Sequence, residues 1–460
     1  MVYLGKKGYT LYKNTLSQNQ LYKIRNDLNV KPYSSHLTNV NSYPIYRESD
    51  TKLYIPRYYG LETIGKLDKN ILSKGNTIDL SFKGELFDYQ KNIIQKYINS
   101  VGESGGGLLD VEPGKGKTVM ALNIISKLKV KTLVIVHKTF LMNQWKERIE
   151  QFLPDAKIGK IQGEIIDIDN KDIVLGMLQS LSSKKYDSDI WSQFGLCVFD
   201  ECHHLSAEVF SNVMIQIVSN YNLGLSGTMT RKDGLTKIFK YFIGPVVHKE
   251  KTDSTIEVLV KNVHYLDDDL FENVKKDFKG NPLYSCMIST LCQCEVRTNM
   301  IVDIVMYEFK NNPEQQMMIL GHNKCLLEKL YELINKFENS VGYYLGGMKE
   351  EELKKSESKK IIIATYAMAS EGLDIKTLTT LLMATPKSDV CQSVGRILRS
   401  KHSKPLVIDI IDPHPIFKNQ FKKRKSYYNK KKYNLFSFKN LEHYYTNETF
   451  NELNEIKKNK

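Results

Sequence analysis

Short apolar runs alternate with amphipathic segments along most of the chain after residue 84. The first set of runs lies at 108–109, 133–136, 173–175, 196–199 and 223–225. A second set repeats the rhythm at 317–320, 343–345, 361–364, 381–384 and 406–410. Because strands that alternate with helical segments form parallel sheets covered by helices, the pattern predicts an α/β protein with two such domains in tandem.

Three changes in the pattern suggest where the domains begin and end. The first eighty residues are rich in Tyr, Asn, Ser and Lys and have only modest apolar runs, which indicates a small accessory domain. A polar, charged stretch near 244–254 is the expected boundary between the two α/β domains. The predicted divisions are 1–80 (accessory domain), 81–250 and 251–415 (α/β domains), and 416–460 (basic C-terminal tail).

The overall charge narrows the choice of partner. The chain has 66 basic and 52 acidic residues, a net charge of +14 and a pI near 9.1. This excess favours a polyanion, with nucleic acid as the leading candidate, over a merely acidic substrate. The seven cysteines are scattered, as expected for reduced thiols, and no apolar stretch approaches the ~18 residues of a membrane span. We therefore expect a soluble intracellular protein of the nucleus, the cytoplasm or, if viral, the virion, with no membrane partner.

A phosphate-binding loop is predicted at 111–118, between a short apolar run and an amphipathic helix. Its glycines allow a tight turn and close approach of the backbone to phosphate. Lys117 is expected to reach the β and γ phosphates of ATP, and the hydroxyl of Thr118 to bind Mg²⁺. The residues expected to contact nucleotide here are Pro113, Gly114, Lys115, Gly116, Lys117 and Thr118.

An acidic pair, Asp200 and Glu201, follows the apolar run at 196–199. A run of this kind is typical of a buried parallel strand, so the carboxylates should emerge at its carboxyl end, where open α/β sheets bind ligands. Asp200 is expected to hold Mg²⁺ and Glu201 to activate water. Together with the phosphate-binding loop, the pair predicts ATP hydrolysis.

The second α/β domain has no phosphate-binding loop but carries two arginines, Arg396 and Arg399, in the segment 392–399. Residues three apart share one face of a helix. A guanidinium that reaches the γ phosphate only when the two domains close would couple hydrolysis to motion. We therefore assign Gln392, Arg396 and Arg399 to the catalytic set.

With these motifs in place, residues 84 to 432 resemble the superfamily-two helicases and translocases. The segment 86–90 is similar to the adenine-contacting element, with Gln90 as the amide reader, although Phe87 stands where relatives often have arginine. Ser226 and Thr228 resemble the motif that couples nucleotide state to nucleic acid. The resemblance also implies that Gly372 and Asp374 lie near nucleotide, and that His203 couples hydrolysis to the domain interface. It implies two RecA-like domains.

Within the superfamily, the segments 133–138, 143–145 and 176–180 resemble the XPB and UvsW branch rather than the DEAD-box RNA helicases. The sequences at 231–234 and 409–412 point to the same branch. Within it the chain resembles the poxvirus-type transcript-release DNA helicases and their relatives in other large DNA viruses, in part through its composition rich in Lys, Asn and Tyr. The resemblance implies that five residues contact the backbone of one nucleic-acid strand. They are His137, Lys138, Gln179, Ser180 and Thr365.

The expected function is that of an ATP-dependent DNA helicase or double-strand translocase in viral transcription or repair, with ATP and Mg²⁺ as cofactors and the monomer favoured. Two alternatives remain: an RNA helicase, and an ATP-switched module that docks on a transcription complex through residues 1–80 without unwinding. The basic segment 418–432 is also open. Its aromatic residues could stack on bases or pack on the second domain.

Overall fold

The computed structural model describes residues 2–32, 41–112, 114–201, 207–227, 235–249, 257–267, 269–272, 274–278, 280–370, 375–398 and 405–449. The chain forms two compact units, Met1–Glu250 and Lys251–Lys460. None of the described helices has the length and apolar character that a membrane crossing requires.

The first unit is built on an eight-stranded sheet in the order β11-β10-β12-β9-β13-β14-β8-β15. Its strands are β8 (Gly106–Asp110), β9 (Thr132–Val136), β10 (Ile158–Gln162), β11 (Ile165–Asp167), β12 (Ile173–Met177), β13 (Leu196–Phe199), β14 (Tyr221–Ser226) and β15 (Val246–Lys249). All neighbours are parallel except β10 and β11. The central strands β9, β12 and β13 are fully buried, which is why their sequences are continuous apolar runs rather than alternating ones.

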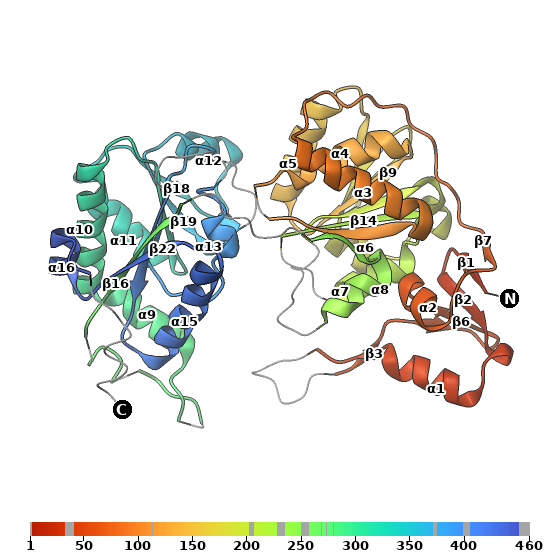
Figure 1. Ribbon diagram of the computed structural model, residues 1–460, viewed down its shortest axis with the longest axis horizontal. Helices are drawn as coiled ribbons and strands as arrows, with labels where there is room; N and C mark the ends of the chain where they lie inside the picture. Colours follow the sequence, from red (N-terminus) through yellow and green to blue (C-terminus); the bar gives the residue numbers. More distant parts are fainter. Residues whose placement is uncertain are drawn as a thin grey trace. The chain divides into compact units, whose positions relative to one another are not determined.

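Helices cover both faces of this sheet (Figure 1). One face is packed by α3 (Asp88–Ser104), α4 (Lys117–Leu128) and α5 (Thr139–Phe152). The other is packed by α6 (Leu178–Ser183), α7 (Ala207–Gln216) and α8 (Thr236–Ile243). A short 3-10 helix, Ser188–Gln193, precedes β13. The predicted doubly covered parallel sheet is confirmed.

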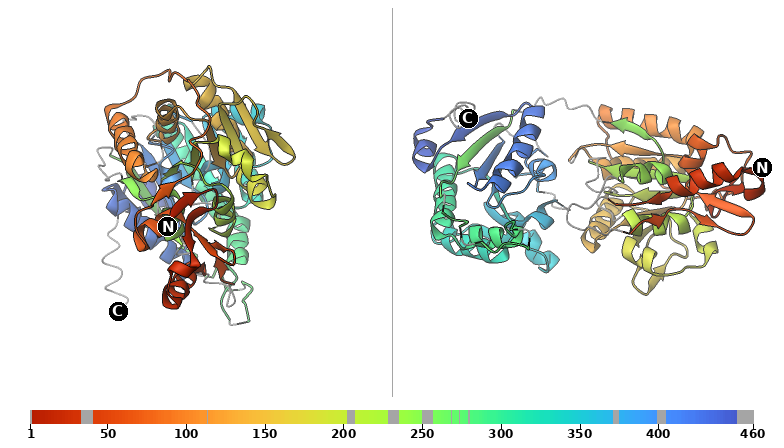
Figure 2. Two further views of the ribbon diagram at one scale, coloured as in Figure 1. Left: turned by 90° about the vertical axis from the view of Figure 1, so that its right-hand side faces the viewer. Right: turned by 90° about the horizontal axis from the view of Figure 1, so that it is seen from below.

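The N-terminal region forms a five-stranded sheet in the order β5-β6-β2-β1-β7. Its elements are β1 (Tyr3–Gly5), β2 (Gly8–Tyr12), α1 (Gln18–Asp27), β5 (Arg47–Glu48), β6 (Lys52–Ile55), α2 (Arg57–Thr63) and β7 (Lys69–Asn70), with the 3-10 turn Lys13–Thr15 and the small ladder of β3 (Asn29–Val30) and β4 (Tyr43–Pro44). Figure 1 and the right-hand view of Figure 2 show this region beside the part of the first unit that is built on the eight-stranded sheet. Helix α2 packs on α8, where the rings of Tyr59 and Tyr241 meet edge to face at 5.2 Å. The apolar side chains on the inner face of the five-stranded sheet, Tyr9 and Leu11 among them, join the core beneath α6 to α8.

The second unit is built on a fully parallel seven-stranded sheet in the order β18-β19-β17-β20-β21-β16-β22. Its strands are β16 (Leu259–His264), β17 (Met317–Gly321), β18 (Val341–Tyr344), β19 (Ile361–Thr365), β20 (Thr380–Met383), β21 (Leu406–Ile411) and β22 (Asn434–Phe438). The helices α9 (Tyr284–Gln293), α10 (Glu295–Asn311), α11 (Lys324–Ile334) and α16 (Leu441–Thr446) share one core. The opposite face carries α12 (Glu350–Glu357), α13 (Tyr366–Ser370) and α14 (Cys391–Val394).

The basic segment near the C-terminus is part of this second unit. Helix α15 (Pro415–Lys430) precedes β22, the edge strand of the sheet. Its aromatic side chains Phe421 and Tyr428 are buried, as is the following Tyr433. Burial removes these three rings from any stacking on bases, so of the two interpretations left open, packing on the second domain is confirmed for them.

Two carboxylates are held in buried ion pairs: Asp409 in β21 and Asp412 directly after it. Asp409 accepts hydrogen bonds from Arg424 Nε at 2.7 Å and from the Tyr428 hydroxyl at 3.1 Å. Asp412 is bound by two nitrogens of Arg297, at 2.6 and 3.0 Å, and both side chains are fully buried. In this structure the carboxylates of the segment 409–412 therefore tie α10 and α15 to the sheet.

Candidate functional site

The phosphate-binding loop connects β8 to α4 at the carboxyl edge of the first sheet. Gly114 and Gly116 have φ of 84° and 78°, values that glycine adopts readily and other residues rarely do. Because α4 begins at Lys117, its first backbone N–H groups have no carbonyl partner within the helix and are placed to bind an anion. The local sequence therefore builds the anion site that the motif predicts.

Gln90, from the start of α3, braces this loop. Its Nε2 donates to the Lys115 carbonyl at 3.2 Å, and its Oε1 accepts from the backbone N–H of Phe87 at 3.0 Å. The Tyr89 hydroxyl donates to the same Lys115 carbonyl at 3.1 Å. A Cβ on Gly116 would lie 2.4 Å from Gln90 Nε2, so a side chain at this position would displace the Gln90 amide. The adenine-reading role of Gln90 stays a prediction.

The acidic pair lies close to the loop in space. Asp200 and Glu201 directly follow β13, which is separated from β8 only by β14. Lys117 Nζ lies 3.0 Å from Glu201 Oε1, and both side chains are largely buried. Glu201 has φ of 48°, a left-handed conformation that costs a non-glycine residue about 1 kcal/mol or more. This backbone turn places the Glu201 carboxylate against the ammonium that the loop presents.

Asp200 is buried, and Trp145 Nε1 on α5 donates to its Oδ2 at 2.8 Å. Burial, followed by the charge of Glu201, raises the pKa of Asp200 to about 6. A hard cation such as Mg²⁺ prefers the oxygens of a carboxylate and a hydroxyl, and Asp200 with Thr118 on the first turn of α4 offers both. Trp145 is not among the residues predicted for this site, and only its position on the helix after β9 could have suggested this role.

Ser226 ends β14, the strand between the loop and the acidic pair. It is fully buried, and its carbonyl accepts the backbone N–H of Val111 at the start of the loop, at 2.9 Å. Movement of the loop would therefore act directly on the end of β14. This position is compatible with the coupling role expected of Ser226, which stays a prediction.

The candidate nucleic-acid contacts of the first unit follow the two neighbouring strands β9 and β12. Lys138 and Gln179 are exposed, and His137 is half-buried. Gln179 Nε2 donates to the His137 carbonyl at 3.0 Å, which joins the two segments. The structure thus brings these three predicted residues together at one edge of the sheet.

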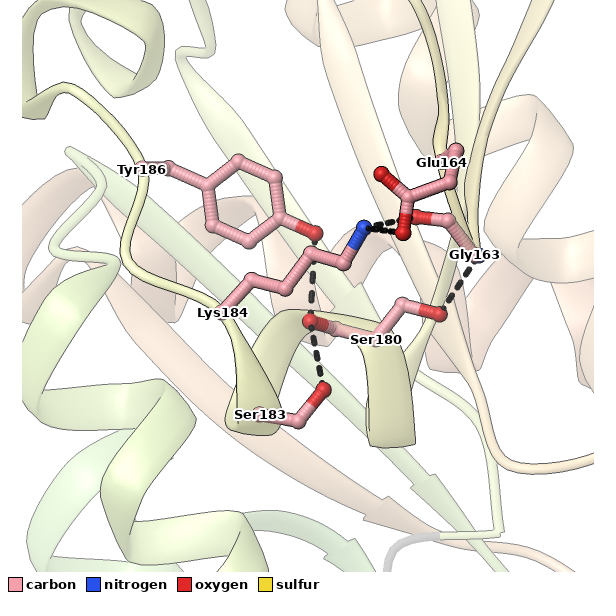
Figure 3. Close-up of polar contacts among 6 residues, drawn as sticks. All are labelled: Gly163, Glu164, Ser180, Ser183, Lys184 and Tyr186. Atoms are coloured by element: carbon pink, nitrogen blue, oxygen red, sulfur yellow. Dashed lines mark hydrogen bonds and ion pairs between the residues drawn. The ribbon is translucent and has the colours of Figure 1, made fainter.

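Ser180 differs from its neighbour because it is buried and engaged within the protein (Figure 3). Its Oγ accepts the backbone N–H of Gly163 at 2.9 Å, and its carbonyl accepts the Tyr186 hydroxyl at 3.1 Å. Lys184 closes the same cluster by donating to the Gly163 carbonyl at 2.8 Å and pairing with Glu164 at 2.5 Å. In this arrangement Ser180 anchors the turn between β10 and β11 to α6.

Three predicted residues lie in the described part of the second unit. Thr365 ends β19, is half-buried, and accepts the Met368 backbone N–H through Oγ1 at 3.4 Å. Gln392 lies on α14, and Arg396 follows that helix with its side chain largely buried. Six further predicted residues lie outside the described residues: Pro113, His203, Thr228, Gly372, Asp374 and Arg399.

A protein family matches the part of the chain that contains the loop and the acidic pair. Residues 83–231 match the res subunit of type III restriction enzymes. A putative ATP-dependent RNA helicase of Acanthamoeba polyphaga mimivirus is 36% identical over 444 residues, which cover 93% of this chain and 85% of that protein. A putative helicase of Invertebrate iridescent virus 6 is 29% identical, covering 82% of this chain and 88% of that protein. A DNA 3'-5' translocase of Sulfurisphaera tokodaii is 25% identical, covering 77% and 88%.

Proposed function

The chain belongs to the superfamily-two helicases, and from this premise we propose that it is a DNA helicase or double-strand DNA translocase that couples ATP hydrolysis to movement. Members of this family are nucleic-acid-stimulated ATPases, and the comparisons extend that activity to this chain. Beyond this activity, we propose that DNA is the preferred nucleic-acid substrate and that the protein acts in viral transcription or repair.

One observation carries the ATPase part of the proposal: the contact between Lys117 and Glu201 at 3.0 Å. It joins the end of the phosphate-binding loop to the residue best placed to activate water. On ATP binding the Lys117 ammonium would move from Glu201 to the β and γ phosphates. Glu201 would then be released to orient and deprotonate the attacking water. The ion pair therefore keeps the general base occupied until nucleotide arrives.

Asp200 and Thr118 would hold Mg²⁺, which supplies charge neutralisation at the β and γ phosphate oxygens when it is bound. Trp145 orients Asp200 through the hydrogen bond to Oδ2. Gln392 and Arg396 are proposed, from the family resemblance alone, to take part in catalysis. Five further residues are proposed to link hydrolysis to the nucleic-acid backbone: His137, Lys138, Gln179, Ser226 and Thr365.

The choice of DNA rests on the sequence features shared with the XPB and UvsW branch. The excess of basic residues supports a polyanion but does not distinguish the sugar. The names of the relatives divide between an RNA helicase and a DNA translocase. An RNA helicase is therefore the second candidate, and its support is the higher identity of the mimivirus relative.

The deciding experiment is a steady-state ATPase assay on the full chain without nucleic acid and with single-stranded DNA, double-stranded DNA or single-stranded RNA of one sequence. Lys117→Ala serves as the blank, because it removes the ammonium that meets the phosphates. Stronger stimulation by DNA than by RNA supports the proposal. Stronger stimulation by RNA transfers the function to an RNA helicase, and equal basal rates under all conditions contradict both.

The third possibility, an ATP-switched docking module that acts through residues 1–80, is supported by a folded N-terminal sheet on the first unit. Deleting that region would not test it cleanly. Tyr59 and the inner face of the sheet share a core with α8, so the deletion would expose apolar surface of the ATP-binding unit. Point substitutions on the outer face are the appropriate test.

A further inference from the structure

The N-terminal sheet has an outer face whose composition is set by its register. Tyr3 pairs with Thr10 across β1 and β2, and Thr10 pairs with Tyr54 across β2 and β6. Tyr12 pairs with Lys52 in the same ladder. Paired residues lie on the same face of a sheet, and successive residues point to opposite faces. Because Leu11 and its neighbours on the other face are in the core, these tyrosines and Lys52 lie on the outer face.

The three tyrosines are half-buried and form one aromatic surface with basic side chains between them. The ring centroids of Tyr3 and Tyr12 are 6.4 Å apart. Lys52 Nζ lies 4.9 Å from the Tyr12 centroid and 5.5 Å from that of Tyr3, and it donates to the Tyr3 hydroxyl at 3.1 Å. Lys7 Nζ lies 5.0 Å from the Tyr54 centroid. A Cβ on Gly5 would lie 3.1 Å from the Tyr3 ring, so glycine lets that ring lie over the strand.

The charge of this face is positive. Arg47 pairs with Tyr54 across β5 and β6, and Lys69 pairs with Tyr3 across β7 and β1, so both share the outer face. Glu48 pairs with Leu53 and therefore points to the opposite face, where it meets Lys13 and Arg25. Among the described strand residues of this sheet, the outer face carries no carboxylate.

We propose that this outer face, defined by Tyr3, Tyr12, Tyr54, Lys7, Arg47 and Lys52, binds single-stranded nucleic acid. Unpaired bases stack on aromatic rings without regard to sequence, while interspersed basic groups contact the phosphates. A duplex offers the phosphates but hides the faces of its bases. This binding surface is independent of the ATP site. It would give the accessory domain its own contact with single-stranded nucleic acid, separate from the nucleic-acid contact expected near Lys138 and Gln179.

The test uses the full chain without nucleotide and a fluorescent twenty-nucleotide oligo-dT, with binding followed by anisotropy. The double variant Tyr12→Leu with Tyr54→Leu keeps apolar bulk on the strands but removes two stacking rings. We expect its affinity for the oligonucleotide to fall by at least tenfold, since the loss of one stacked base typically changes affinity by roughly fivefold or more. Affinity for duplex DNA should change by less than twofold.

Tyr22→Leu is the matched control, because Tyr22 is a 75% exposed tyrosine on α1 of the same region and outside the face. A thermal melt and the basal ATPase rate establish that each variant is folded. Photocross-linking with 5-iodouracil in the oligonucleotide supplies an independent readout, with adducts expected on Tyr3, Tyr12 or Tyr54. Equal affinities of the double variant and Tyr22→Leu, or adducts confined to other segments, would overturn the inference. A chain without nucleic-acid-stimulated ATPase that still shows the double-variant effect would overturn the proposed function alone.

Discussion

The indole Nε1 of Trp145 donates a 2.8 Å hydrogen bond to Oδ2 of Asp200. Trp145 is on α5, the helix that follows the candidate nucleic-acid contact Lys138. Asp200, the proposed magnesium ligand, follows β13. The bond therefore joins this helix to the proposed metal site. Both side chains are buried. The bond is therefore a direct physical link between the ATP site and the helix whose N-cap is Lys138.

Replacing Trp145 with Phe should retain most of the packing but remove the donor. The hydrogen bond lowers the pKa of Asp200 against the larger effect of burial. Its loss should therefore raise that pKa further and shift the acidic limb of the ATPase pH profile to higher pH, with a lower kcat. A pH profile of kcat/KM at subsaturating Mg²⁺ and ATP measures this effect, because that ratio reports the pKa values of the free protein.

Trp191→Phe is the control for that substitution, because Trp191 is the other tryptophan of the chain and is also buried. It packs against Tyr186 at 5.3 Å and Phe194 at 6.4 Å, away from the acidic pair. Its pH profile should match that of the unmodified protein. Identical profiles for both tryptophan variants would show that the bond to Asp200 has no part in the reaction.

Affinity for Mg²⁺ and ATP should depend on pH through Asp200. Because the pKa of Asp200 is raised to about 6, the folded protein binds this proton more tightly than the unfolded chain does. The contribution of protonated Asp200 to the stability of the folded protein is present below about pH 4 and is lost as the pH rises to about 6. Metal binding needs the ionised form, so affinity should fall below pH 6 by up to about tenfold per pH unit.

Titration of a fluorescent ATP analogue at pH 5, 6 and 7 in the presence of Mg²⁺ tests this expectation. Asp200→Asn supplies the background, since protonation of the nucleotide itself affects both proteins equally. Parallel pH dependences in the two proteins would exclude Asp200 as the titrating ligand.

Glu201→Gln should abolish turnover while nucleotide and nucleic-acid binding remain. The amide cannot accept the proton of the attacking water, and it also removes the charge that holds Lys117 at 3.0 Å. ATP affinity should therefore stay equal or rise, because the ammonium no longer has to leave a carboxylate. Single-turnover hydrolysis and nucleotide titration separate the two effects. Unimpaired hydrolysis in this variant would contradict the role of Glu201 as the general base.

Asp412→Asn should destabilise the second unit by roughly 3–5 kcal/mol, because it leaves the fully buried Arg297 without a counter-charge. The matched control is Glu295→Gln, since Glu295 is on the same helix and forms an exposed pair with Lys329 at 2.7 Å. That control should have little measurable effect. Urea denaturation should be followed by circular dichroism, because both tryptophans are in the first unit.

Much of the ATP site could be predicted because its determinants are local. The apolar run before Asp200 places that residue at the end of β13, and the glycines before Lys117 place the lysine at the start of α4. The order of the strands in the sheet then brings the two residues close together. The partners of Asp412 and Ser180 could not be predicted, because Arg297 is 115 residues from Asp412 and a backbone N–H carries no sequence signal. The outer face of the N-terminal sheet was missed for a related reason. Its alternation becomes visible only when short strands are paired in register.

Gly116→Ala should weaken nucleotide binding more than its backbone strain alone would explain. At φ of 78° an added Cβ would lie 2.4 Å from Gln90 Nε2, and that amide holds the Lys115 carbonyl. Displacing Gln90 would shift the loop that meets the phosphates, so ATP affinity should fall by tenfold or more. Gly163→Ala is the control, since Gly163 also has a positive φ, 56°, but an added Cβ there meets nothing within 4 Å. It should lose only the roughly 1 kcal/mol of stability that a left-handed alanine costs and keep its ATP affinity. Equal ATP affinities in the two variants would mean that the contact with Gln90 does not shape the phosphate-binding loop.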